Sequence, residues 1–136
     1  MKLNPYLFFN GNCAAAFKYY EKCLGGKIAT MLTHAETPAG EQVPPEWREK
    51  IIHARMTVAG TQLMASDAPP GRQAEMGGFS VSLIVDTPAD ASRIFNALAA
   101  NGTVRMPLEK TFFAASFGMI VDQFGVPWMI NCEAQQ

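Results

Sequence analysis

This chain of 136 residues lacks the patterns that mark several large classes of protein. It has only three cysteines and no CxxC pair, so we expect neither a disulfide framework nor a thiolate metal site. Its net charge is -1 and its Lys and Arg residues are scattered, so it has no positive field to attract a phosphate backbone. The sequence therefore predicts reduced thiols and no nucleic-acid partner.

Long hydrophobic runs are also missing. No apolar segment approaches the roughly 20 residues that span a bilayer. The N-terminal segment breaks at Asn10 and Gly11 before the core of a signal peptide forms. We therefore expect a cytoplasmic protein with no membrane contact. The hydrophobic fraction of 49% and the charged fraction of 17% fit one compact domain that buries a substantial core.

The first part of the chain, module one at residues 1–67, has the pattern of a βαβββ unit. Apolar positions recur at helical spacing after Asn12, a candidate N-cap, and Gly25-Gly26 is a typical helix end. Two apolar runs flank Ala59-Gly60, a candidate two-residue hairpin turn. The expected elements are a strand at 3–9, a helix from Cys13 to Leu24, a strand at 27–34 and a hairpin at 51–67, with a polar, Pro-rich segment at 34–50.

The second part repeats this order. Residues 68–77 are rich in Pro and Gly and form the expected linker, and module two follows at 78–133. Thr87 with Pro88 and Asp90 is a typical helix start. The expected strands are 79–86, 103–113, 115–122 and 126–132, and Gly118 is expected to interrupt the third of them.

Two βαβββ units in tandem resemble the vicinal oxygen chelate superfamily, which includes glyoxalases, extradiol dioxygenases and bleomycin-resistance proteins. The segments "MPLEKTFFAASFGMIVDQFGVPWMIN" and "YLFFNGNCAAAFKYYEKCLGG" are similar to its PhnB-like branch, also labelled demethylubiquinone methyltransferase-like. The resemblance covers nearly the whole chain. It implies an α+β fold in which tandem βαβββ modules form a curved mixed sheet around a concave cavity, and it implies a homodimer.

The sequence does not support the methyltransferase label or a resident metal. No glycine-rich turn joins a strand to a following helix, so we expect no nucleotide-like cofactor. Metal-using members of the superfamily take one His or Glu from each of four strands. Here those places fall at or beside Asn4, Met64, Ser80 and Met129, none of which is a carboxylate or an imidazole. Glu133 is expected to lie beyond the last strand and on the wrong face to bind a metal.

Strand alternation predicts which side chains face the cavity. In the hairpin, Arg55 should lie opposite Met64 and His53 opposite Ser66, while Ala54 and Leu63 should pack under the helix. This set of polar side chains suits a small polar or anionic ligand. The candidate ligand-binding residues are Asn4, Tyr6, His53, Arg55, Met64, Ser66, Ser80, Ser82, Met129 and Asn131.

Several of these residues also have a purely structural interpretation. His53 is either a general base or a structural residue, because no acid is placed by sequence to orient it. Arg55 either clamps an anion or pairs with a surface acid such as Glu46 or Glu49. Cys13 stands at a helix N-terminus, which favours reactivity, and on the buried stripe, which favours a core thiol.

The sequence leaves three functions open and names no catalytic residue. The favoured one is a small-molecule-binding protein without a built-in metal. The alternatives are a metal-dependent lyase or dioxygenase of the glyoxalase type, and a dimer of the bleomycin-resistance type that sequesters an antibiotic. His34, at a strand end before the Pro-rich segment, is expected to be solvated.

Overall fold

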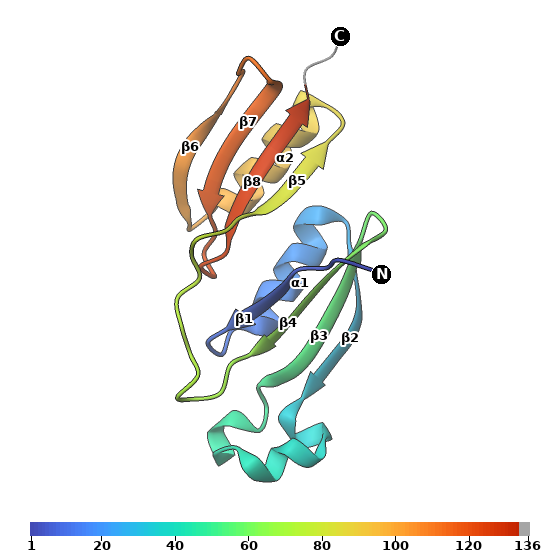
Figure 1. Ribbon diagram of the computed structural model, residues 1–136, viewed down its shortest axis with the longest axis vertical. Coiled ribbons are helices and arrows are strands. Elements are labelled where there is room, and N and C mark those ends of the chain that lie inside the picture. Colours follow the sequence, from blue (N-terminus) through green and yellow to red (C-terminus); the bar gives the residue numbers. More distant parts are fainter. Residues whose placement is uncertain (134–136) are drawn as a thin grey trace. The chain divides into compact units, whose positions relative to one another are not determined.

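A computed structural model describes residues 1–133 of the chain. The chain divides into two compact units, Met1–Ala74 and Glu75–Gln136. Each unit has the order βαβββ and forms one helix and one four-stranded mixed sheet, which confirms the α+β prediction (Figure 1). None of the described helices is long and apolar enough to cross a membrane.

The elements of the first unit are β1 (Tyr6–Phe9), α1 (Cys13–Leu24), β2 (Lys27–Thr33), β3 (Ile51–Val58) and β4 (Thr61–Asp67), with short 3₁₀ helices at His34–Glu36, Pro38–Gln42 and Pro45–Trp47. Those of the second unit are β5 (Val81–Val85), α2 (Pro88–Ala99), β6 (Thr103–Glu109), β7 (Ala114–Val121) and β8 (Pro127–Glu133).

The two sheets share one topology and one register. Their strand orders are β1-β4-β3-β2 and β5-β8-β7-β6, and in each sheet the first pair is parallel and the other two are antiparallel. Residues can therefore be matched between sheets by their partners across the strands. The matched positions are Tyr6 with Ser82, Met64 with Met129, Arg55 with Met119, and Thr30 with Met106.

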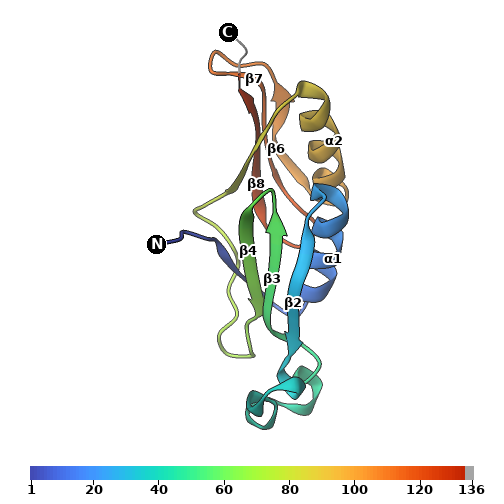
Figure 2. The ribbon, with the colours of Figure 1, turned by 90° about the vertical axis from the view of Figure 1, so that its right-hand side faces the viewer.

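Each helix covers one face of its own sheet, as Figure 2 shows for α1 and α2. In the first sheet Ala54, Met56 and Leu63 are buried on this face, and the predicted hairpin register, with Arg55 opposite Met64, is confirmed. In the second sheet Trp128 and Ile130 are buried in the same way. Side chains of the intervening positions therefore lie on the face that no helix of the same unit covers.

Buried carboxylates hold the ends of the elements together. In the first unit Asp67 Oδ1 accepts hydrogen bonds from the backbone N–H groups of Gly11 (2.9 Å) and Cys13 (3.0 Å), and Oδ2 accepts one from Ile51 N–H (2.8 Å). Asn12, the predicted cap of α1, makes no capping bond with its side chain. Asp67 has replaced it because the end of β4 brings a carboxylate to the N-terminus of the helix.

The second unit uses Asp122 similarly, in the turn between β7 and β8. Its Oδ1 accepts from the N–H groups of Phe124 (2.8 Å) and Val126 (3.0 Å), and its Oδ2 accepts from the Trp128 indole N–H at 2.8 Å. This turn therefore fixes where β8 begins.

Several predicted strand limits are wrong; β5, for example, begins at Val81, so Ser80 lies before it, and β1 and β6 differ most. β1 begins at Tyr6, so Asn4 lies before the strand; the ladder with β4 starts at the Pro5 carbonyl, which accepts from Met64 N–H at 3.1 Å. β6 ends at Glu109, because the Thr111 hydroxyl accepts hydrogen bonds from Phe113 N–H and Ala114 N–H and turns the chain.

Gly118 does not interrupt its strand, contrary to prediction. β7 runs through it, and a Cβ at this position would come within 2.6 Å of the Phe95 ring. The glycine makes room for α2 to pack on the sheet.

Replacing Asp67 by Ala should destabilise the protein strongly. The substitution leaves three backbone donors without their acceptor, which corresponds to a loss of about 3 kcal/mol at roughly 1 kcal/mol for each. Urea unfolding followed by circular dichroism measures the difference. Asp86→Ala, at an exposed site, is the control and should change the free energy of unfolding by less than about 0.5 kcal/mol. Equal losses in the two variants would contradict the role given to Asp67.

Candidate functional site

The open face of the first sheet gathers four of the predicted ligand-binding residues. Tyr6, Met64 and Arg55 lie in register across β1, β4 and β3. His53, two residues before Arg55, approaches the first of them: its Nδ1 lies 3.3 Å from the Tyr6 hydroxyl, and the two rings stack with centroids 6.0 Å apart. A cation, an imidazole, a phenol and a thioether thus share one surface.

Arg55 has an unsatisfied donor on this surface. Its side chain is half-buried, and its Nε is buried with no hydrogen-bond partner in the described part of the chain. Within residues 1–133 it forms no ion pair with Glu46 or Glu49, the surface acids considered as partners. A buried N–H without an acceptor costs free energy. Because the Arg55 side chain is only half-buried, the accessible part of the guanidinium is where an anion would bind.

Aromatic side chains form the adjoining part of the surface. Tyr6 and Phe8, on alternate positions of β1, are 37% and 58% exposed, and their ring centroids lie 5.1 Å apart. Phe8 was not among the predicted site residues, although its position two residues after Tyr6 in "YLFF" indicates that the two side chains share a face of the strand. Ser66, the neighbour of Phe8 in the ladder, is buried. Asn4 is half-buried and lies outside the strand.

The open face of the second sheet carries different chemistry. Ser82 lies beside Met129, and the row continues through Met119 to Met106, so it is largely apolar. Asn131, two residues after Met129, has a buried Oδ1 with no hydrogen-bond partner among residues 1–133. Ser80 lies before β5 and lines a separate cavity of this unit.

The expectation for Glu133 is wrong. Continued pairing with β7 carries β8 to Glu133, which lies opposite Ala114 and, by alternation, on the face of Met129 and Asn131. Its side chain is exposed at the end of the strand.

His34 is buried rather than solvated, contrary to prediction. Its Nδ1 lies 2.9 Å from the Lys50 carbonyl oxygen. Glu36 accepts hydrogen bonds from the Thr33 N–H and hydroxyl, which starts a 3₁₀ turn and folds His34 inward against Gly40. This histidine has a structural role.

Cys13 is a core thiol. It is fully buried at the start of α1, and burial, with a further contribution from the negative charge of Asp67, raises the pKa of its thiol far above the ordinary value. Because the thiolate is the reactive form, the helix N-terminus does not make Cys13 a nucleophile here.

The residues present do not fit a divalent metal of the glyoxalase type. Within residues 1–133 no three His, Cys, Asp or Glu side chains come together as ligands. The central rows of the two open faces offer a phenol and a thioether at Tyr6 and Met64, and a hydroxyl and a thioether at Ser82 and Met129. These neutral donors do not supply the negative charge that a divalent cation requires of its ligands, so they do not form a metal site of the glyoxalase type.

Comparison with known proteins agrees with the fold. Residues 2–130 match the family described as Glyoxalase/Bleomycin resistance protein/Dioxygenase superfamily. The chain belongs to this superfamily, as its two βαβββ units predicted.

Its relatives include proteins of nearly the same length. Protein YjdN of Escherichia coli strain K12 is 39% identical over 147 aligned residues, which cover 100% of this chain and 98% of the relative. The crystal structure of protein PA1353 from Pseudomonas aeruginosa is 49% identical, covers 99% of both chains and has a TM-score of 0.91. The PhnB protein from Bacillus cereus shares the fold, with a TM-score of 0.82, 24% identity and coverage of 97% and 99%.

The stability of the protein should depend on pH through Cys13. Because the pKa of this thiol is raised in the folded state, the unfolded chain loses the proton first as the pH rises above about 9. The stabilising contribution is complete below that pH and decreases above it, by at most about 1.4 kcal/mol for each pH unit. Urea unfolding at several pH values between 8 and 10.5 measures the slope. Cys13→Ala should have a flatter profile; parallel profiles would contradict the assignment.

Proposed function

We propose that this protein binds a small molecule with an anionic group on the open face of the first sheet, through Arg55 and without a built-in metal. The observation that carries the proposal is that Arg55 is partly exposed on this face and has no hydrogen bond or ion pair within the described residues. The proposal concerns binding, and no chemical step is assigned to the site.

The chemistry of Arg55 favours an anion with two acceptor oxygens. A guanidinium presents parallel N–H groups that match a carboxylate or a phosphate in a bidentate arrangement. A hydrogen bond that involves a charged group contributes roughly 1.5–3 kcal/mol. The same positive charge disfavours cationic ligands, among them cationic antibiotics.

The neighbours of Arg55 suggest the rest of the ligand. The exposed rings of Tyr6 and Phe8 offer an apolar wall, and the Tyr6 hydroxyl with His53 offers a second polar contact. A ligand that combines an anionic head with a small apolar or aromatic body would use both parts of the surface.

Arg55→Met should weaken this binding about tenfold or more while leaving the fold intact. The scaffold accepts methionine there, because Met119 stands at the matched position of the second sheet. The substitution also removes an unpaired buried donor, so the melting temperature without ligand should be unchanged or higher. The dissociation constants of inorganic phosphate, acetate, succinate and benzoate, read from the ¹⁵N chemical shifts of Tyr6 and Met64 on the first sheet, should increase about tenfold or more in this variant.

Arg72→Met is the matched control, because Arg72 is exposed and the same charge is lost. It should bind the probes as the unmodified protein does. If no probe shifts the resonances of Tyr6 and Met64, or if these shifts report binding as tight in Arg55→Met as in the control, the proposal is wrong.

The homodimer and the cytoplasmic location stay predictions, and the dimer is supported by the family resemblance alone. Sedimentation equilibrium at micromolar concentration should give twice the mass of one chain. A single species with the mass of one chain across the accessible concentration range would contradict the dimer.

A further inference from the structure

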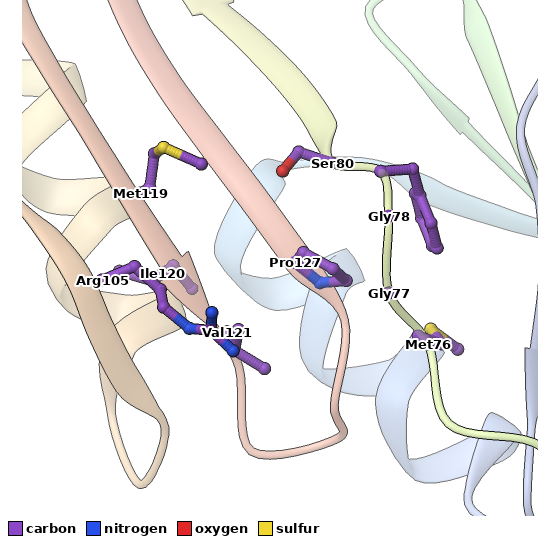
Figure 3. Close-up of a pocket in the computed structure, with 10 residues that line it drawn as sticks. Met76, Gly77, Gly78, Ser80, Arg105, Met119, Ile120, Val121 and Pro127 are labelled. Atoms are coloured by element: carbon purple, nitrogen blue, oxygen red, sulfur yellow. The ribbon is translucent and has the colours of Figure 1, made fainter.

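The second unit contains a cavity that the proposed site at Arg55 does not include, and Ser80, one of the predicted ligand-binding residues, lines it. Its volume is about 260 Å³, and it lies where β7 ends and β8 begins (Figure 3). The lining residues that matter for its chemistry are Met76, Phe79, Ser80, Arg105, Met119 and Pro127. The volume is slightly below the roughly 300 Å³ at which pockets for drug-sized ligands begin, so a small occupant is expected.

A β-bulge places Arg105 at this cavity. Val104 pairs with Ile120 and Met106 pairs with Met119, so Arg105 is an extra residue of β6 without a partner of its own on β7. Bulges of this kind redirect a side chain and recur beside binding sites. The alternation of β6 is shifted here, which brings the guanidinium to the face of Met119.

The bulge itself does not require an arginine. The first sheet has the same irregularity, because Ile28 pairs with Met56 and Thr30 pairs with Arg55, leaving Ala29 as the extra residue. One fold position thus holds an alanine in the first unit and an arginine in the second. The fold therefore does not need a charged residue at this position, and the charge of Arg105 is available for binding in the cavity.

Arg105 is also free to bind. Its side chain is exposed, and within residues 1–133 it has no hydrogen bond or ion pair. None of the described residues that line the cavity is acidic, so none of them neutralises the positive charge of Arg105. An anion is the complementary occupant.

The width of the sheet sets the shape of that occupant. Figure 3 shows Arg105 and Ser80 on opposite sides of the ribbon of β8, which begins at Pro127. Ser80 precedes β5 and Arg105 belongs to β6, so β8 and β7 lie between their strands. Neighbouring strands are about 4.8 Å apart, and three such spacings separate β5 from β6. The two polar groups are therefore suited to opposite ends of one molecule.

We propose that this cavity is a second binding site, which takes a small organic acid. Its carboxylate binds Arg105, its apolar body lies over Met119 and Pro127 beside Phe79 and Met76, and a polar group at the other end bonds the Ser80 hydroxyl. All the residues that line this cavity belong to the second unit, so Arg55 is not among them.

Benzoate, 4-(hydroxymethyl)benzoate and the uncharged 1,4-benzenedimethanol test the proposal. Titration followed by ¹⁵N chemical shifts should move the resonances of Ser80, Arg105 and Met119 with both acids. The diol should bind at least tenfold more weakly, because it lacks the charge that a guanidinium recognises. The hydroxymethyl acid should bind several-fold more tightly than benzoate.

Two substitutions separate the contacts. Arg105→Ala, which copies the alanine of the first unit, should weaken both acids about tenfold or more. Ser80→Ala should remove only the advantage of the hydroxymethyl group. Arg93→Ala, at an exposed arginine on α2, is the control and should leave both affinities unchanged.

The experiment also separates this site from the one at Arg55. Arg55→Met should leave the shifts at Ser80 and Arg105 intact, whether or not the first sheet binds anions. The proposal is overturned if the acids cause no shifts in the cavity, if the diol binds as well as the acids, or if Arg105→Ala binds them as tightly as Arg93→Ala does.

Discussion

The parallel pairing of the first and last strands of each unit is the constraint on which the rest of the structure depends. It places β1 beside β4 and β5 beside β8. Antiparallel pairing then extends the register to β3 and β2 in the first sheet and to β7 and β6 in the second. Because side chains alternate along every strand, one register decides both what the helix buries and what remains on the open face. Asp67 secures the arrangement in the first unit by joining the end of β4 to the start of α1.

The same scaffold carries different chemistry in its two copies. Arg55 and Met119 occupy matched positions, as do Tyr6 and Ser82, so the first open face is polar and aromatic where the second is rich in thioethers. At the bulge of the outer strand the charged residue is in the other unit: the first unit has an uncharged residue there and the second has Arg105. Side chains that no helix covers are free to differ, because packing does not restrict them.

Membership of the superfamily establishes the fold, but the activity depends on which side chains the fold carries. Where a metal-dependent member would need carboxylates or imidazoles, this chain offers thioethers and hydroxyls on the strands. Arg55 and Arg105 instead have donors that no other described residue satisfies. Both proposed sites therefore use an arginine to bind an anion.

The sequence by itself determined the order of the elements, the hairpin turn at Ala59-Gly60 and the pairing of Arg55 with Met64, because periodicity and turn chemistry involve neighbouring residues. Only the tertiary structure decided that Asp67 caps a helix 54 residues earlier in the chain, that His34 is buried, that Glu133 belongs to β8 and that Arg105 stands in a bulge. Each of these depends on groups that the fold brings together from separate elements, or on pairing with another strand, and no local pattern records such contacts. The unsatisfied Nε of Arg55 is of the same kind, because only packing removes a donor from water without supplying its partner.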